Sequence, residues 1–466
     1  MSRLALVLVI IALLIGAYLR FNNLGALQMS ADEGATWAAA DAPSIREVVA
    51  LQQTHNAGKS PLHDLMLHGW IAIFGDSVGA MRAMSALCGV IAILLMVPVT
   101  REVLRISFAD RLPAIPRDDA DMIAALGAII CAVELVTIKY SREMRMYSLM
   151  LALVLAQVWI FLRALRLRGF GDYFALAVLT AAVIAVNPVS APILATEGLW
   201  LLTILATYRD AEYRARSALL VALSMALGLL ALSPGMFTVA ARLHRHVESG
   251  GYNWLPQPPI WAPAAFFNKA TGSFAFPAMA ALAAWGIWRG WTRAKDSLIF
   301  ALLWMWTPPI LLVAGSYLSR PMFIERYAVY SFPAFFILVA IGIWELASNI
   351  ARAAATVVIV ILAFGHAHSY SLKTHDVDWH EAARVAQASL RPDDKFAVTP
   401  PYAVEVVRYY VYPPLRGNAV GYDPATAHSA VVILAEHGVN PAVAAQVRRD
   451  YPRVLKRARG VVVLSR

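Results

Sequence analysis

Long apolar runs alternate with short polar connections over the first 370 residues or so of the chain. The first run, LALVLVIIALLIGAYL, begins at Leu4, and similar windows recur until about Tyr370. A helix needs about 20 mainly apolar residues to cross the hydrocarbon core of a bilayer. The pattern therefore predicts an α-helical polytopic membrane protein.

Eleven segments are long and apolar enough to be predicted as spans. They cover residues 4–20, 79–100, 121–139, 146–165, 171–187, 189–207, 217–237, 273–289, 297–316, 328–346 and 353–370. If the N-terminus is cytoplasmic, every inside connection carries arginine or lysine, as the positive-inside rule requires. The first span could instead be a cleaved signal peptide, although Arg20 interrupts the usual small-residue cleavage site.

The last stretch, residues 371–466, has a different pattern, with frequent charges and prolines. Its short apolar runs KFAVT, AVVILAE and GVVVLS are typical of strands, and WHEAARVAQASL has the period of an amphipathic helix. We therefore expect two domains. Residues 1–370 form a transmembrane domain whose outer loop, residues 21–78, carries an acidic motif, and residues 371–466 form a small α/β domain on the outer, periplasmic side.

Composition agrees with a membrane protein, since 59% of the residues are hydrophobic and 15% charged, and the mean hydropathy is +0.60. The net charge of +10 does not indicate a nucleic-acid partner, because the arginines lie in short clusters between apolar runs and fit topology signals better. Cys88 and Cys131 both fall inside apolar windows, so no disulfide framework is implied.

Some cations depart from the positive-inside rule, and these lie at the outer ends of spans: Lys139, Arg142, Arg145, Arg320 and Arg326. A cation in such a place needs a buried partner or an anionic ligand. For any one of them, snorkelling or pairing with Glu143 or Glu325 is a sufficient explanation. As a set on the same side as an acidic pair, they favour an anion-binding site.

The acidic pair is Asp32 and Glu33, in the segment QMSADEGATW that follows the first span. Two adjacent acids can simply be solvated. A carboxylate near the membrane surface with cations around it also suits displacement on a lipid-linked phosphate. The carboxylate would take a proton from the nucleophile, and guanidinium groups would neutralise the departing phosphate.

Four segments occur in an order that resembles a known family: MSADEGATW, KSPLHDLMLHGWIAIFGDSVGAMRAMSALCG, YSREMRMYSLMLAL and RPMFIERYAVYSFPAFFIL. They are similar to the signatures of bacterial GT-C glycosyltransferases. The branch is that of the dolichyl-phosphate-mannose protein mannosyltransferases and the lipid A aminoarabinose transferases. The resemblance runs over most of residues 1–346. It implies a GT-C fold with about eleven transmembrane helices and a polyprenyl-phosphate-linked sugar as donor.

The resemblance carries over to particular residues. Asp32 falls on the catalytic acidic position, with Glu33 beside it. Donor phosphate binding is assigned to Arg326, Tyr327, Arg142 and Arg145, and the outer cation Lys139 is a further candidate from its position in the sequence. Glu143 is the candidate for a second acid.

The acceptor side departs from the family pattern. The family's Pro-Pro-Leu-Tyr reads Ser60-Pro61-Leu62-His63 here, which leaves the shape of that side open. His55 and His63 are candidate ligands or proton carriers there, although an interfacial histidine needs no such role.

These observations predict an inverting hexosyl- or pentosyltransferase of the bacterial inner membrane, acting on a glycan, lipid or protein acceptor at the outer face. Asp32 and Glu33 could also hold a divalent metal, Mg²⁺ or Mn²⁺, because carboxylate and phosphate oxygens suit these ions. Membrane lipids are the other expected partners.

The rival hypotheses are a transporter or flippase of lipid-linked sugars and a non-catalytic assembly subunit.

Overall fold

The computed structural model describes residues 1–56, 58–106, 115–207, 211–248, 255–272, 274–371, 377–391, 394–424 and 429–466. The chain forms two compact units. Unit 1 comprises Met1–Asn22, Gly58–Ser60 and Ala83–Ser371, and unit 2 comprises Asn23–Ala57, Pro61–Arg82 and Leu372–Arg466. Most of the outer loop therefore belongs to the same compact unit as the C-terminal residues.

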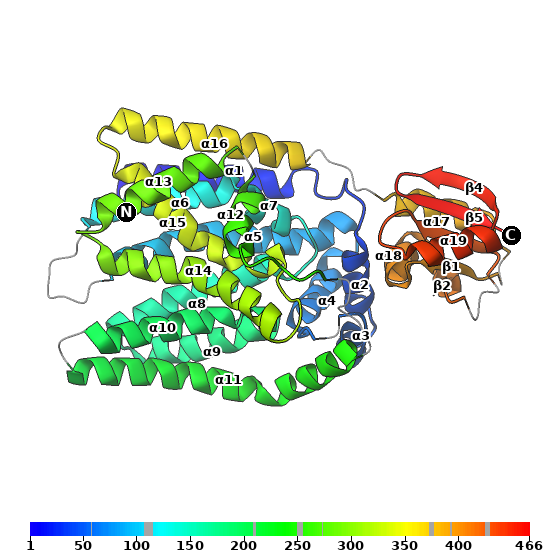
Figure 1. Ribbon diagram of the computed structural model, residues 1–466, viewed down its shortest axis with the longest axis horizontal. Coiled ribbons are helices and arrows are strands. Elements are labelled where there is room, and N and C mark those ends of the chain that lie inside the picture. Colours follow the sequence, from blue (N-terminus) through cyan, green and yellow to red (C-terminus); the bar gives the residue numbers. More distant parts are fainter. Residues whose placement is uncertain are drawn as a thin grey trace. The chain divides into compact units, whose positions relative to one another are not determined.

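Unit 1 is helical (Figure 1). Its elements are α1 (Arg3–Phe21), most of α5 (Val78–Leu104), α6 (Arg117–Val133), α7 (Leu135–Ser141), α8 (Tyr147–Leu167), α9 (Phe170–Val186), η1 (Pro188–Ser190), α10 (Pro192–Thr207), α11 (Ala211–Glu248), α12 (Ala262–Thr271), α13 (Phe276–Gly290), α14 (Lys295–Leu318), η2 (Glu325–Tyr327), η3 (Val329–Ser331), α15 (Phe332–Trp344) and α16 (Asn349–Ser371). Among the described residues, seven helices are long and apolar enough to cross a membrane, or nine if each of two bent pairs counts as one span. The predicted polytopic helical fold is confirmed. Nine of the eleven predicted segments overlap these spans, and the other two, residues 171–187 and 328–346, overlap the shorter apolar helices α9 and α15.

One predicted span, residues 121–139, is not a continuous helix. It is broken at Glu134 into α6 and α7, which are bent by 58°. A break leaves backbone carbonyls without their helical partners. The fully buried Arg20 guanidinium of α1 donates to several of the groups around the break: the carbonyls of Cys131 and Ala132 at 3.1 and 3.0 Å, and the hydroxyls of Thr137 and Ser141 at 3.0 and 3.3 Å. Arg20 therefore stabilises the bend.

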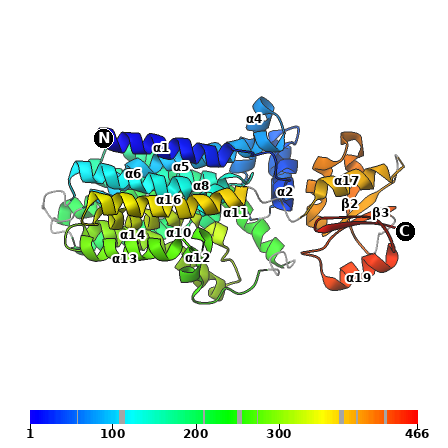
Figure 2. The ribbon, with the colours of Figure 1, turned by 90° about the horizontal axis from the view of Figure 1, so that it is seen from above.

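Close helix packing in unit 1 depends on small residues, as is usual between membrane helices. Helices α13 and α15 meet at Gly286 and Gly342. A Cβ added to Gly286 would lie 2.6 Å from the backbone nitrogen of Gly342, and one added to Gly342 would collide with the carbonyl oxygen of Leu282. Elsewhere in the unit, α16 runs along α1 and α6 (Figures 1 and 2).

Unit 2 combines three helices of the outer loop with a mixed sheet. Its elements are α2 (Ala31–Ala40), α3 (Ile45–His55), α4 (Leu62–Phe74), α17 (Trp379–Ala388), β1 (Phe396–Thr399), η4 (Pro401–Ala403), α18 (Val404–Tyr410), η5 (Pro413–Asn418), β2 (Ala419–Gly421), β3 (Val431–Ala435), α19 (Pro441–Asp450), β4 (Arg453–Ala458) and β5 (Val461–Ser465).

The sheet order is β2-β1-β3-β5-β4. Strand β1 pairs in parallel with β2 and β3, whereas β5 pairs antiparallel with β3 and β4. Helices α17 and α19 cover opposite faces (Figure 2), so β3 is buried along its whole length. The three predicted strands and the predicted helix are confirmed as β1, β3, β5 and α17.

The Gly286 contact generates a prediction. Replacement of Gly286 by Ala should lower the apparent Tm in detergent, because overpacking a close backbone contact costs about 1 to 3 kcal/mol. Gly198→Ala in α10 is the control, since a Cβ there meets no heavy atom within 4 Å. Both changes gain the same helix propensity, so an equal Tm for the two variants would contradict the packing argument.

Candidate functional site

The acidic motif forms the first turn of α2, in unit 2. The Ser30 hydroxyl accepts a hydrogen bond from the Glu33 N–H at 3.3 Å, and Glu33 Oε2 accepts one from the Ser30 N–H at 2.9 Å. Together they form a capping box, which satisfies two backbone donors at the helix start. The sequence signal is the spacing Ser30-x-x-Glu33, so the position of Glu33 follows from local capping as well as from any chemistry.

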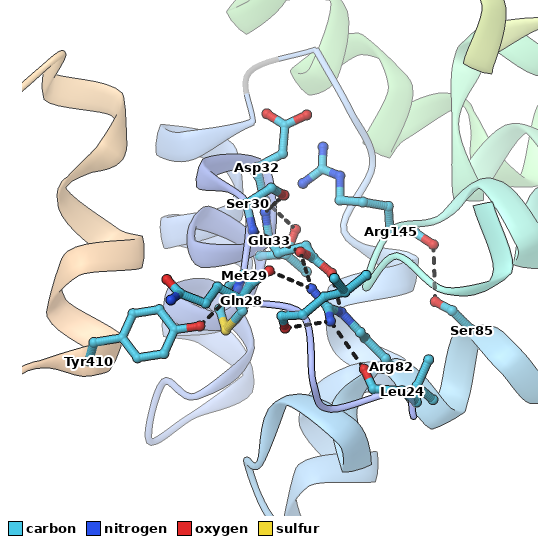
Figure 3. Close-up of polar contacts among 12 residues, drawn as sticks. Leu24, Gln28, Met29, Ser30, Asp32, Glu33, Arg82, Ser85, Arg145 and Tyr410 are labelled. Carbon is cyan, nitrogen blue, oxygen red and sulfur yellow. Dashed lines mark hydrogen bonds and ion pairs between the residues drawn. The ribbon is translucent and has the colours of Figure 1, made fainter. Parts of the chain in front are cut away.

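Glu33 is also one half of a buried ion pair. Arg82 Nε and Nη2 donate to its two carboxylate oxygens, each at 2.8 Å, and both side chains are about 98% buried. Nη1 donates to the carbonyls of Leu24 and Leu27, and Nη2 also donates to the carbonyl of Gln28. The five N–H groups of Arg82 therefore meet five acceptors (Figure 3).

Asp32 lies beside this pair but has a different environment. Successive residues of a helix differ by about 100° in direction, and Asp32 is exposed where Glu33 is buried. Figure 3 shows the Asp32 carboxylate pointing away from the Arg82 guanidinium. Of the two acids, Asp32 is thus the solvent-exposed one, and Glu33 holds the helix start in place.

A divalent metal does not fit this acidic pair. Both oxygens of Glu33 already accept hydrogen bonds from Arg82, and the described residues contain no group of three or more His, Cys, Asp or Glu side chains arranged to hold a metal ion. A hard cation such as Mg²⁺ needs several oxygen ligands. No step proposed below therefore passes through a metal.

Within unit 2, the C-terminal residues pack directly on α2. A Cβ added to Gly34 would lie 2.5 Å from the Cα of Val406 in α18, so only glycine allows this approach. The Tyr410 hydroxyl accepts a hydrogen bond from the Met29 N–H at 2.8 Å, and burial raises the pKa of Tyr410 to about 12. Trp37 meets the ring of Tyr409 edge-on, with 5.1 Å between centroids.

Tyr402 of η4, in the C-terminal region, lies within electrostatic range of Asp32. Its pKa is raised above the ordinary value, first by partial burial and then by the negative charge of Asp32. Its side chain remains 62% exposed.

The two histidines predicted for the acceptor side, His55 and His63, lie on helices of unit 2. His55 ends α3, and its Nε2 lies 3.9 Å from Glu405 Oε1 of α18. His63 is buried in α4, where its side chain is 2% exposed. Neither observation tests an acceptor role, and both are consistent with packing within unit 2.

In unit 1, a cluster of aromatic rings surrounds Arg326. Its guanidinium lies 5.7 Å from the ring centroid of Tyr147 and 6.0 Å from that of Tyr327. Tyr147 in turn meets Tyr140, with 5.4 Å between centroids. We call Tyr140, Tyr147, Arg326 and Tyr327 the tyrosine–arginine cluster. Such contacts between a guanidinium and aromatic faces are favourable cation–π interactions.

Two other predicted phosphate ligands, Arg142 and Arg145, form different hydrogen bonds. Arg142 is buried, and its Nη1 donates to the carbonyls of Leu19 and Asn22 at 3.0 and 2.7 Å, which caps the end of α1. Arg145 is also buried, and its carbonyl accepts a hydrogen bond from the Ser85 hydroxyl (Figure 3).

Lys139 and Glu143 are less buried than the two arginines. The Lys139 ammonium lies over the ring of Tyr140, 5.2 Å from its centroid. Glu143 is half-buried in the turn between α7 and α8. Arg142 thus caps the end of α1, whereas Lys139 lies against the tyrosine–arginine cluster.

A cavity of about 280 Å³ in unit 1 is lined by two cations, of which Arg320 belongs to the set of outer cations predicted from sequence and Lys59 does not. Its lining includes Lys59, Arg320, Asn187 and Tyr327, with leucines and prolines around them. Tyr327 thus belongs both to this cavity and to the tyrosine–arginine cluster. The sequence could have indicated Lys59 as a candidate, because it is a lysine in an outer loop directly before the segment Ser60-Pro61-Leu62.

Comparison with solved structures identifies the fold. ArnT from Cupriavidus metallidurans matches in the apo state with a TM-score of 0.66 at 13% identity, covering 99% of this chain and 97% of that one. Its structure bound to undecaprenyl phosphate matches with a TM-score of 0.66 at 14% identity over the same shares. The Archaeoglobus fulgidus oligosaccharyltransferase, in complex with Zn and sulfate, matches with a TM-score of 0.62 at 11% identity, covering 96% of this chain and 71% of that one.

The chain has the GT-C glycosyltransferase fold. No family model and no curated protein sequence matches it. The GT-C fold is thus shown by structure alone, and the fold expected from the four sequence segments is confirmed.

The Arg82–Glu33 pair yields the prediction for this site. Arg82→Ala should destabilise the protein by about 3 to 5 kcal/mol, because it leaves a buried carboxylate without its partner. Arg82→Lys should rescue little, since one ammonium cannot reach acceptors spread over a guanidinium fork. The measurement is the apparent Tm in detergent.

Arg384→Ala is the matched control for this prediction, because it removes an exposed arginine that makes the same two-nitrogen contact with Glu381. Exposed pairs contribute little, so its Tm should hardly move. A small change in both variants would show that α2 does not depend on Arg82.

Proposed function

We propose that this protein is a membrane glycosyltransferase that moves a sugar, with inversion, from a polyprenyl-phosphate donor to an acceptor at the outer face of the bacterial inner membrane. The observation that carries the proposal is the exposed Asp32 on a helix start that the buried Arg82–Glu33 pair holds in place. The GT-C fold and the ArnT structure with undecaprenyl phosphate support the choice of donor.

Asp32 acts as the general base in this proposal. It accepts the proton of the acceptor hydroxyl or amine as the nucleophile attacks the anomeric carbon, and the bond from that carbon to the phosphate oxygen breaks in the same step. A single in-line displacement inverts the anomeric centre. Tyr402, whose pKa responds to Asp32, is placed to hydrogen-bond the acceptor.

Arg326 binds the phosphate of the donor in this scheme, because a guanidinium offers a planar fork of N–H donors that matches phosphate oxygens. The Arg326 guanidinium lies over the rings of Tyr147 and Tyr327. Lys59 and Arg320 add positive charge in the cavity that shares Tyr327. Arg145 and Lys139 are further phosphate ligands in this scheme, and Glu143 is the proposed second acid. The departing polyprenyl phosphate leaves as a dianion, and these cations lower the cost of its charge.

The acceptor is a glycan, a lipid such as lipopolysaccharide, or a protein. The inside connections of the spans carry the basic residues, which supports a cytoplasmic N-terminus and a periplasmic C-terminal domain.

A transporter of lipid-linked sugars is the second candidate, and one observation favours it. The α6–α7 helix is broken at Glu134, and that side chain is fully buried. Transporters use broken helices with buried polar groups near the midplane. Transport activity that survives loss of Asp32 would support this alternative.

The central prediction concerns Asp32. Asp32→Asn keeps the shape of the side chain but removes the basic oxygen, so the single-turnover rate of transfer should fall roughly 10²- to 10⁴-fold while the donor still binds. The measurement uses a synthetic polyprenyl-phosphate sugar, with donor binding followed in parallel.

Asp41→Asn is the control, because Asp41 caps the other end of the same helix and should leave the rate unchanged. Near-normal turnover in Asp32→Asn would remove the catalytic assignment. Loss of both binding and turnover would make Asp32 a structural residue.

A second prediction concerns Arg326. Arg326→Ala should weaken donor binding by about 2 kcal/mol or more, because a charge-assisted phosphate contact is lost, and Arg326→Lys should recover only part of it. Equilibrium binding of the donor lipid to detergent-solubilised variants measures the effect. Lys269→Ala removes a mostly exposed cation that pairs with the adjacent Glu325 and serves as the control. Donor affinity that is unaffected in Arg326→Ala would exclude Arg326 from the site.

A further inference from the structure

Unit 1 contains a groove away from the proposed catalytic and donor-binding residues, between α1, α6 and α16. Its wider part is a cavity of about 690 Å³, and a second hollow of about 170 Å³ continues it. The two hollows share the lining residues Ile129, Thr356 and Val357, so they follow one another along the same helices. None of the proposed catalytic or donor-binding residues lines either part.

The groove is polar at one end and apolar along the rest. The wider part begins at Ser2 on α1, and the second hollow reaches Ile15 on the same helix. At 1.5 Å per residue, the groove extends roughly 20 Å along α1. This length is comparable with one leaflet of a hydrocarbon core about 30 Å thick. The lining of the second hollow is apolar apart from Thr356, as an acyl chain requires.

The polar end carries charges of both signs: Asp118 and Asp119 in the first turn of α6, and Arg352 in the first turns of α16. Arg352 is held in place, because its guanidinium lies 4.1 Å from the ring centroid of Trp344 and Nη1 donates to Asn349 Oδ1 at 3.3 Å. Among the described residues, neither Asp118 nor Asp119 forms an ion pair. The nearby Asp121, by contrast, pairs with Arg101 and accepts from the Ser2 N–H.

We propose that this groove binds a phospholipid whose headgroup carries a primary ammonium and a phosphate, as phosphatidylethanolamine does. The ammonium meets Asp118 and Asp119, the phosphate meets Arg352, and one acyl chain occupies the apolar part. Charge complementarity selects this occupant. An anionic headgroup would face the two aspartates, and a quaternary ammonium has no N–H to donate to them. The bound lipid would fill the space between α16 and the α1–α6 pair.

The proposal predicts a lipid-specific stabilisation. The full-length protein in detergent receives phosphatidylethanolamine, phosphatidylcholine or phosphatidylglycerol with identical acyl chains, and tryptophan fluorescence reports the apparent Tm. Phosphatidylethanolamine should raise Tm by roughly 3 °C or more above the other two, because a ligand of the folded state stabilises it by mass action. Native mass spectrometry should show one such lipid retained per chain.

Variants locate the effect. Asp119→Asn combined with Arg352→Gln should abolish the extra Tm shift and the retained lipid. The control pair is Asp296→Asn with Arg289→Gln: Asp296 lies in the first turn of α14, and Arg289 stacks on Trp285 at 5.7 Å, but neither lines the groove. This pair should keep both signals. Val357→Phe, which fills the part shared by the two hollows, provides a test that leaves the charged end intact and should also abolish the shift.

Three results would overturn the proposal: equal stabilisation by all three lipids, stronger stabilisation by phosphatidylglycerol, or a shift that persists in both the charge variant and Val357→Phe. Transfer activity does not enter the test, so its outcome is independent of the proposed function.

Discussion

The buried ion pair between Arg82 and Glu33 is the contact on which the acidic motif depends. Burying two charges is costly unless both are paired and hydrogen-bonded, and here one guanidinium meets two carboxylate oxygens and three backbone carbonyls. The carbonyls belong to the segment that leads into α2. The Arg82 side chain therefore fixes the segment that precedes α2, the first turn of that helix and the direction in which Asp32 projects.

The same helix start explains why the C-terminal residues and the outer loop form one compact unit. Val406 packs closely against the backbone at Gly34, and the Tyr410 hydroxyl accepts a hydrogen bond from the Met29 N–H. The residues on either side of Asp32 are thus held by α18 as well as by Arg82. The α/β part of the chain supports the acidic motif directly, which makes it more than an appended domain.

Unit 1 uses its arginines in two physically different ways. Arg20 and Arg142 donate to carbonyls at helix breaks and ends, where the membrane offers no water to satisfy these groups. Arg326 instead lies against the faces of Tyr147 and Tyr327. The capping role of Arg142 depends on carbonyls about 120 residues away in the sequence, so no local pattern predicts it.

Hydropathy by itself located the helices and the strands β1, β3 and β5, because burial in a membrane or a sheet core depends on the apolarity of residues close together in the chain. The capping box was equally local, since Ser30 and Glu33 are three residues apart. Only the tertiary structure separated the roles of Asp32 and Glu33, because the partner of Glu33 is 49 residues away. It also decided that the span at Glu134 is broken and that the outer loop packs with the sheet. These features depend on pairs of side chains distant in sequence, and no local pattern of apolar and polar residues records which of them meet.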